Sequence, residues 1–215
     1  MIFPVLAVCT PMTSVRSRLS ISLDGFAAAP NQSLEQPFGD GGMRLPQWQF
    51  ETDQPGRAGD AGVLTRSTEN IGAYVMGRNM FGPGRGDWDL SWTGWWGDEP
   101  PYHAPVFVLT HHPREPLEMQ GGTTFHFVTD GVESAVRQAK DAAGEQDVTI
   151  AGGASTVRQC LAAGLIDELQ LHLVPITLGA GERLFDDIAG IELEPVGVLA
   201  SPTVTHLTYR VSTSG

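Results

Sequence analysis

Three short loops carry groups suited to phosphate binding, and each follows an apolar run typical of a buried strand. Residues 77–78 (Gly-Arg) offer a cation, residues 110–112 (Thr-His-His) offer a hydroxyl and two imidazoles, and residues 152–155 (Gly-Gly-Ala-Ser) open a helical pattern. Glycines let a ligand approach the backbone, and a helix N-terminus presents unpaired N–H groups and a positive dipole end. Each loop alone is equally typical of a turn that binds nothing. Three of them together favour a dinucleotide, which carries more than one phosphate.

Other kinds of site are disfavoured. His103, His111, His112 and His126 do not fall at the spacings of metal ligands and no cysteine pair accompanies them, so we expect no metal site. The sequence lacks the Gly-x-Ser-x-Gly nucleophile turn and the Gly-Lys-Ser phosphate loop. No Gly-x-Gly-x-x-Gly fingerprint follows the first predicted strand, which argues against a standard Rossmann site.

The composition is globular and acidic. The chain has 215 residues, 41% of them hydrophobic, which suffices for one domain with its own core. Its formal charge of -12 disfavours nucleic acid and membranes as partners and leaves a small molecule. Cys9 and Cys160 make no disulfide framework, so we expect a reducing, cytoplasmic compartment. We expect residues 1–11 to be an unstructured extension and residues 12–215 to form the domain.

Alternating strand and helix patterns predict an α/β fold with a mostly parallel sheet. Strand patterns lie at residues 15–23, 73–76, 105–110, 123–129 and 148–151. Helical patterns follow at residues 130–143, where Asp130 and Glu133 resemble a capping box, and from residue 154. The three phosphate-friendly loops then lie at the carboxyl ends of parallel strands, where open α/β sheets bind ligands. Later strand patterns at residues 168–178, 191–199 and 204–211 have no helix between them and predict an antiparallel end.

Two long loops interrupt this pattern. Residues 27–60 are rich in Gly, Pro, Gln and Asp, with one helical turn expected near residues 45–50, and residues 57–70 form a weak helical pattern. A loop of this length is usually functional. Residues 82–104 contain four tryptophans, which are expected to cover a ligand, to line a subunit contact or to cap the core.

Several motifs resemble one family in order and spacing. They are SISLDGF at residues 20–26, MGRNMF at 76–81, VFVLT at 106–110, IAGGAS at 150–155, LIDEL at 165–169 and PITLGAGERLF at 175–185. The chain resembles the dihydrofolate reductase-like family, which includes the C-terminal reductase domain (RibD) of riboflavin biosynthesis, and looks most like its stand-alone bacterial members. The resemblance covers residues 15–211. It implies a mixed sheet with a mostly parallel centre, antiparallel C-terminal strands and helices on both faces, with NADPH as hydride donor.

The resemblance also implies a set of cofactor residues. Residues 152–156 should contact the pyrophosphate, residues 77–79 the cofactor phosphates, and residues 110–112 the adenosine ribose and its 2′-phosphate. The family commonly has Arg or Lys in that last loop, so imidazoles leave open the choice between NADPH and NADH. Residues 27 and 28 should border the nicotinamide. The full set is Ala27, Ala28, Gly77, Arg78, Asn79, Thr110, His111, His112, Gly152, Gly153, Ala154, Ser155 and Thr156.

Substrate residues are less clearly indicated. Bacterial dihydrofolate reductases place a carboxylate on the first long helix, but no single acid stands out in residues 45–60. Asp24 is the acid nearest the expected nicotinamide and is the candidate proton donor, which requires a raised pKa. The alternative is that Asp24 bonds the backbone of its own turn. Leu45 and Trp48 are expected to form an apolar and stacking wall for a flat heterocycle.

These observations predict an NADPH-dependent reductase of a small pterin-, pyrimidine- or flavin-like heterocycle, or of a carbonyl or imine. One alternative is the 5-amino-6-ribosylamino-uracil phosphate reductase of riboflavin biosynthesis. Another is a non-catalytic nucleotide- or pterin-binding protein. A homodimer through the tryptophan loop or the late strands stays open.

Overall fold

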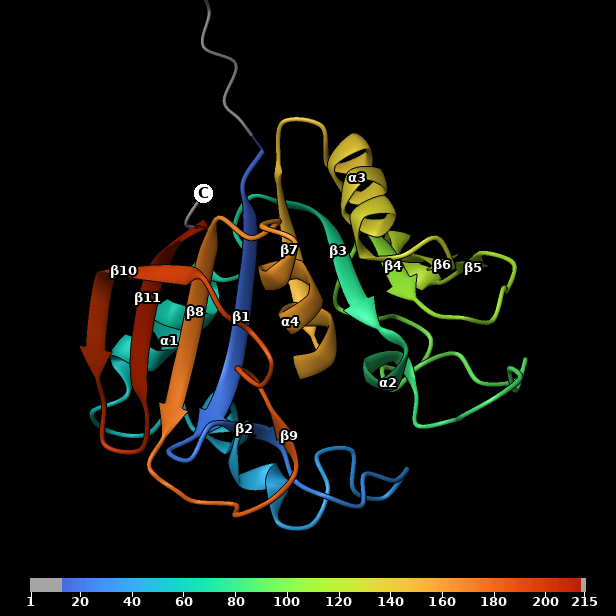
Figure 1. Cartoon of the computed structure of the whole chain (residues 1–215). Coiled ribbons are helices and arrows are strands. Elements are labelled where there is room, and N and C mark those ends of the chain that lie inside the picture. Colours follow the sequence, from blue (N-terminus) through green and yellow to red (C-terminus); the bar gives the residue numbers. More distant parts are fainter. Residues whose placement is uncertain (1–12, 214–215) are drawn as a thin grey trace, which may run out of the picture.

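A computed structural model describes residues 13–213, and nine strands of this part form one sheet (Figure 1). The strand order is β10-β11-β8-β1-β7-β3-β4-β6-β5. The pairs from β8 to β6 are parallel, whereas β10 with β11, β11 with β8, and β5 with β6 pair antiparallel. The strands are β1 (Val15–Ser22), β3 (Ile71–Gly77), β4 (Pro105–Leu109), β5 (Leu117–Glu118), β6 (Thr124–Val128), β7 (Asp147–Gly152), β8 (Glu168–Val174), β10 (Ile191–Ala200) and β11 (Thr205–Thr213). The predicted parallel centre and antiparallel C-terminal end are confirmed, and the antiparallel edge at β5 was not expected.

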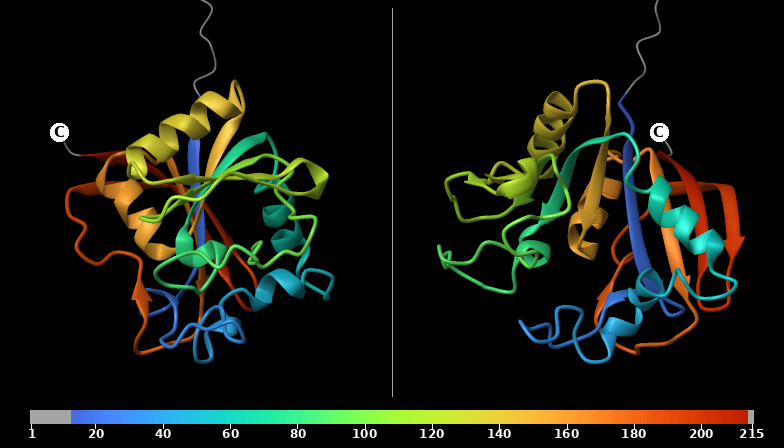
Figure 2. Two further views of the ribbon diagram at one scale, coloured as in Figure 1. Left: turned by 90° about the vertical axis from the view of Figure 1, so that its right-hand side faces the viewer. Right: turned by 180° about the vertical axis from the view of Figure 1, so that it is seen from behind.

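Helices cover both faces of the sheet, as predicted. Figure 2 shows α3 (Val132–Ala143) and α4 (Ala154–Ala162) on one side and α1 (Ala58–Arg66) on the other. A short helix α2 (Arg78–Phe81) follows β3, and the 3₁₀ turns are η1 (Gly42–Arg44), η2 (Gln47–Phe50) and η3 (Gln120–Gly122). The expected capping box is wrong. Gly131, at φ 90°, is the N-cap of α3 and no side chain caps the helix, so Asp130 lies one residue too early.

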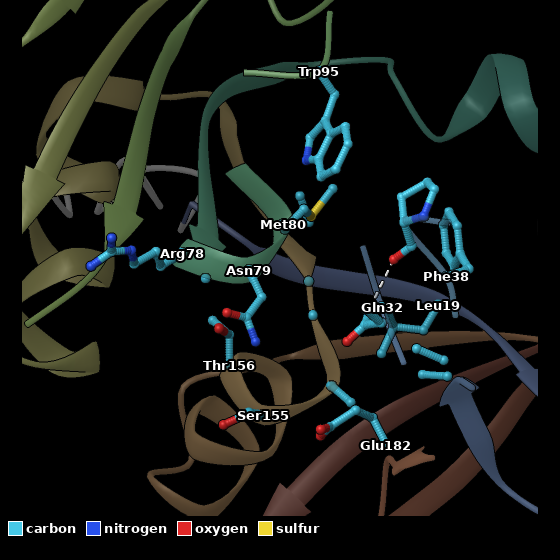
Figure 3. Close-up of a pocket in the computed structure, with 18 of the residues that line it drawn as sticks. Leu19, Gln32, Phe38, Arg78, Asn79, Met80, Trp95, Ser155, Thr156 and Glu182 are labelled. Carbon is cyan, nitrogen blue, oxygen red and sulfur yellow. Dashed lines mark hydrogen bonds between the residues drawn. The ribbon is translucent and has the colours of Figure 1, made fainter. Parts of the chain in front are cut away.

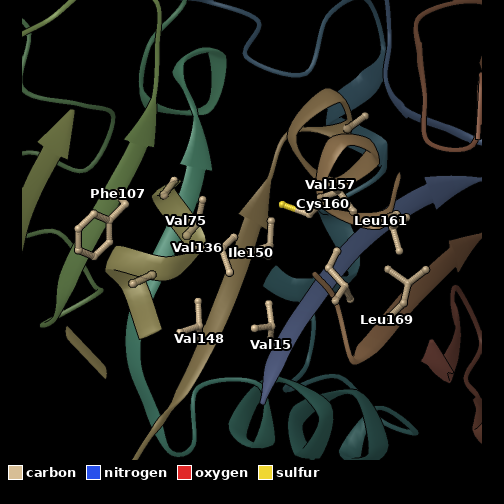
Figure 4. Close-up of a cluster of buried hydrophobic side chains, with 14 of the residues drawn as sticks. Val15, Val75, Phe107, Val136, Val148, Ile150, Val157, Cys160, Leu161 and Leu169 are labelled. Carbon is tan, nitrogen blue, oxygen red and sulfur yellow. The ribbon is translucent and has the colours of Figure 1, made fainter. Parts of the chain in front are cut away.

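The main core lies between the sheet and the pair α3 and α4 (Figure 4). Strand periodicity places Val75 of β3 on this face, beside Val148 and Ile150 of β7. Small side chains on α3, including Ala135 and Ala139, are fully buried and let this helix approach the strands closely. The core is therefore formed by the alternate apolar residues of the strands that the sequence pattern predicts.

The tryptophan loop covers the opposite face of β3, β4 and β6. Trp88, Trp92 and Trp96 pack against a second buried cluster that contains Phe81 and Phe125. The structure shows the loop capping the core, and Trp95 and Trp96 of the same loop line the cleft described below, so covering a ligand stays a prediction, as does the subunit contact.

The long loop after β1 is fixed at its root by a small second sheet. Strand β2 (Phe26–Ala28) pairs antiparallel with β9 (Glu182–Arg183). The neighbouring Gly181 has φ 131°, and a Cβ there would lie 2.0 Å from the carbonyl oxygen of Ala28. The loop therefore leaves the sheet from a tightly packed base. Across residues 13–213, every helix is too short or too polar to cross a bilayer.

Candidate active site

A cleft of about 1040 Å³ opens where several parallel strands end. Figure 3 shows its walls, with Asn79 and Met80 on one side and Gln32 and Phe38 of the long loop on another. Every predicted cofactor residue lines this cleft: Ala27, Ala28, Gly77, Arg78, Asn79, Thr110, His111, His112, Gly152, Gly153, Ala154, Ser155 and Thr156. Segments far apart in sequence are thus brought to one cavity. The ligand contacts assigned to each residue remain predictions.

The glycine turn and the end of β3 are in close contact. A Cβ at Gly77 would lie 2.3 Å from Oγ1 of the buried Thr156, so no larger residue fits without movement. The Gly152–Gly153 peptide is cis, and α4 begins at the next residue, Ala154. The N–H groups of the first turn of α4 have no partner within the helix, and its dipole is positive at this end. This edge of the cleft suits an anionic group.

Trp88 connects two of the predicted cofactor loops. Its indole Nε1–H donates to the carbonyl oxygen of His112 at 2.7 Å, and the guanidinium of Arg78 lies 3.9 Å above its ring. Burial, followed by repulsion from Arg85, lowers the pKa of Arg78. Arg78 therefore lies against the tryptophan loop, and Figure 3 shows it pointing away from Thr156, whereas Asn79 points toward Thr156.

Arg85 is one of two cations of the cleft that the sequence reasoning missed; the other, Arg18, lies in its inner half. Arg85 lines the cleft and donates to the side-chain oxygen of Asn79. It lies in the Gly/Pro-rich part of the tryptophan loop, where the sequence carries no periodic signal. Its proximity to a predicted phosphate residue could be found from the structure alone.

The inner half of the cleft lies on the α1 face of the sheet. Its wall includes Trp48, as predicted, and five residues that the sequence reasoning did not name: Arg18, Ser20, Tyr74, Tyr102 and His172. Burial raises the pKa values of Tyr74 and Tyr102 and lowers the pKa of Arg18. Trp48 donates its Nε1–H to Ser20 Oγ at 3.0 Å. The strand residues Arg18, Ser20, Tyr74 and His172 therefore make the sheet face polar where it meets the cleft.

The structure corrects the prediction for Asp24. This residue does not line the cleft; its carboxylate accepts hydrogen bonds from Ser22 Oγ at 2.5 Å and from the backbone N–H groups of Leu178 and Gly179. These bonds, that from Ser22 above all, lower the pKa of Asp24 to about 2. A proton donor needs the opposite shift. The alternative considered was a bond to the backbone of its own turn, but the backbone N–H groups that Asp24 accepts from belong to the segment after β8.

The prediction for Leu45 is also corrected. Leu45 is fully buried in a third apolar cluster with Val63 and Val204, and it does not line the cleft. In consecutive 3₁₀ turns, residues three apart share a face. Leu45 and Trp48 are such a pair, and the larger indole of Trp48 is the one that reaches the cleft.

Among the acids of the long loop, Asp60 is the most buried. Its carboxylate is fully buried, 3.0 Å from His206 Nε2 and 3.0 Å from Ser201 Oγ. No cluster of three metal-binding side chains occurs within residues 13–213.

The mixed sheet and its edge cleft define a dihydrofolate-reductase-like α/β domain. The family described as "RibD C-terminal domain" matches residues 13–207, and the chain belongs to this family. The uncharacterized protein YyaP of Bacillus subtilis (strain 168) is 36% identical over 62 residues, which span 29% of this chain and 32% of that protein.

Solved structures share the fold at low identity. A putative riboflavin biosynthesis protein from Shewanella sp. PV-4 has a TM-score of 0.64 at 23% identity, over 93% of this chain and 99% of that chain. A pyrimidine reductase-like protein from Corynebacterium diphtheriae has a TM-score of 0.57 at 17% identity, over 97% and 96%. The Enterococcus faecalis dihydrofolate reductase, solved with NADP(H), has a TM-score of 0.52 at 15% identity, over 94% and 98%.

Proposed function

We propose that this protein is a reductase that binds NADPH in the cleft and reduces a small heterocycle, carbonyl or imine. The observation that carries the proposal is that the predicted cofactor residues, from four separated segments, line a single cleft. Membership of the RibD C-terminal domain family supports it. So does the NADP(H) complex of a dihydrofolate reductase with the same fold.

The cleft fits a dinucleotide chemically. The first turn of α4 would bind the pyrophosphate through its N–H groups, and Gly77 allows β3 to approach that turn. Arg85 and Arg78 supply positive charge on an otherwise acidic protein. The nicotinamide would supply the hydride when bound, while the chain orients donor and acceptor and excludes water.

Arg18 indicates the chemistry of the substrate. It lines the inner half of the cleft, and within residues 13–213 no carboxylate lies within ion-pair distance of it. A partly desolvated cation favours an anionic or oxygen-rich group. This observation favours a phosphorylated pyrimidine, as in riboflavin biosynthesis, as the second candidate beside a pterin or flavin.

Thermal unfolding with NADPH and NADH tests the cofactor. Ligand at about 100 times its dissociation constant adds roughly 2.7 kcal/mol of stability. Gly77→Ala should reduce the NADPH shift because the new Cβ meets Thr156, while Gly84→Ala, which meets no atom within 4 Å, should leave it unchanged. The absence of a shift with either nucleotide would refute the proposal. NADPH oxidation against pterins, flavins and a ribosylamino-pyrimidine phosphate then identifies the acceptor.

A further inference from the structure

Three buried polar side chains form a hydrogen-bonded chain beneath α1. Asp60 of α1, His206 of β11 and His172 of β8 are exposed by 0%, 5% and 3%. Asp60 Oδ1 lies 3.0 Å from His206 Nε2, and His206 Nδ1 lies 2.8 Å from His172 Nδ1. At these distances each contact is a hydrogen bond, so one proton lies between the two atoms of each pair. The chain therefore connects a buried carboxylate to a buried imidazole two side chains away.

The far end of the chain reaches the cleft. His172 lines the inner half of the cleft, and its buried Nε2 has no hydrogen-bond partner within residues 13–213. Its Nδ1 faces β11, whereas its neighbour on the other side is Ser20 of β1, which also lines the cleft. A buried polar atom without a partner is costly, so a ligand group that bonds Nε2 would remove this cost.

Trp48 fixes both imidazoles. Its ring centroid lies 4.8 Å from each histidine ring, with the planes at 60° and 68°. Its own Nε1–H is taken by Ser20 Oγ, so the indole does not compete for the histidine nitrogens. The rings are therefore held in register by packing.

The contacts allow two proton arrangements. An ionised Asp60 accepts from His206 Nε2–H, so a neutral His206 has a lone pair on Nδ1, and His172 must then carry its proton on Nδ1. In that state His172 Nε2 is an acceptor. If His206 gains a proton it donates from Nδ1, and His172 then carries its proton on Nε2 and becomes a donor to the cleft.

Charged groups face the chain at both of its ends. Asp60 faces His206 directly, Arg57 of the same segment lies 3.9 Å from Asp60 and is also paired with Glu51, and Arg18 lies on the His172 side. Burial, then His206, then Arg18 lower the pKa of His172 to about 3. His172 therefore remains neutral in both arrangements.

We propose that Asp60, His206 and His172 form a proton relay in which His172 is a catalytic residue and the other two are positioning residues. This inference rests on the proposed function. As the substrate accepts hydride from the reduced nicotinamide, the His172 Nε2–H bond breaks and the proton forms a bond to the substrate atom beside the reduced carbon. The proton on His206 Nδ1 passes to His172 Nδ1. To regenerate the first state, one proton from solvent adds to His172 Nε2 and the Nδ1 proton returns to His206 Nδ1.

Nitrogen NMR of the ¹⁵N-histidine-labelled protein tests the relay without substrate. At the alkaline end of a pH titration we expect His172 to carry its proton on Nδ1, and at the acid end we expect that proton to lie on Nε2, as the two hydrogen-bond arrangements require. Asp60→Asn removes the negative charge that the chain ends on, so the switch should move to lower pH. His126, which stacks on Phe107 away from the cleft, is the internal control.

The NMR titration of the wild-type protein tests the relay by itself, even if Asp60→Asn does not fold. A single His172 tautomer across this pH range, or a switch that Asp60→Asn leaves in place, would overturn the relay. With an acceptor that the enzyme reduces, His172→Gln should lower kcat at least about tenfold with the NADPH thermal shift unchanged, and His126→Gln should match wild type. Loss of the NADPH shift with an intact switch would instead refute the proposed function.

Discussion

The carboxylate of Asp24 links the first turn to the chain after β8. Its pKa in the folded protein, about 2, lies below its ordinary value of 3.8 because Ser22 and two backbone N–H groups favour the charged form. A depressed pKa stabilises the fold above the unfolded-state value, and this stabilisation is lost as the pH falls through the folded-state value.

Asp24→Asn should therefore lower the Tm at pH 7. The difference from wild type should shrink as the pH falls from about 4 toward 2, which is measured by thermal unfolding at a series of pH values. NADPH binding should persist, because Asp24 lies outside the cleft. A Tm difference that is independent of pH would contradict this account of its carboxylate.

At the scale of elements, the tryptophan loop holds together two of the predicted cofactor loops, residues 77–79 and residues 110–112. Trp88 is bonded to His112 and stacked by Arg78, so one side chain connects the segments that follow β3 and β4. Trp92 donates to the carbonyl oxygen of Phe81, the last residue of α2, at 2.9 Å, and within residues 13–213 no hydrogen bond or cation–π contact joins it to Arg78 or to His112. The two tryptophans therefore form a matched pair for experiment.

Trp88→Phe and Trp92→Phe should each cost about 0.5–1.5 kcal/mol of stability, because each loses one hydrogen bond. The first should also weaken NADPH binding, since His112 and Arg78 lose their common support. The second should leave the dissociation constant unchanged. Denaturant unfolding and NADPH titration of both variants measure this, and equal effects on binding would refute this role of Trp88.

At the scale of the whole molecule, Cys160 reports on global unfolding. It is fully buried on α4, and burial raises the pKa of its thiol to about 12, so the reactive thiolate is scarce in the native state. In a Cys9→Ser background, reaction with a thiol reagent should require unfolding. NADPH at about 100 times its dissociation constant should slow the reaction about 100-fold. A rate that NADPH does not change would indicate local opening of α4 instead.

The sheet, its helices and the meeting of the predicted cofactor loops at one cleft could be predicted because their signals are local. Apolar runs, a glycine pair and a helical face lie close together in the sequence. The inner half could not, because its residues occupy the polar face of strands and meet through register. His172 of β8 and His206 of β11, for example, lie opposite each other in the antiparallel strand pair but are 34 residues apart in the sequence.

Other expectations stay predictions. Residues 1–11 lie outside residues 13–213, which the structure describes, so the expected extension is untested. The homodimer, the cytoplasmic compartment and the preference for NADPH over NADH are equally open to experiment. The shifted start of α3 shows how one glycine with positive φ moves a predicted boundary.

The clamp formed by β2, β9 and Gly181 has an evolutionary consequence. It fixes the root of the long loop next to Ala28, while the loop beyond it supplies Gln32, Phe38 and Trp48 to the cleft. Apart from Ala27 and Ala28 in β2, the predicted cofactor residues come from other segments, beyond residue 76. Mutations confined to the codons of this loop can therefore change the substrate in descendants of such a chain. The predicted cofactor segments beyond residue 76 are inherited unchanged.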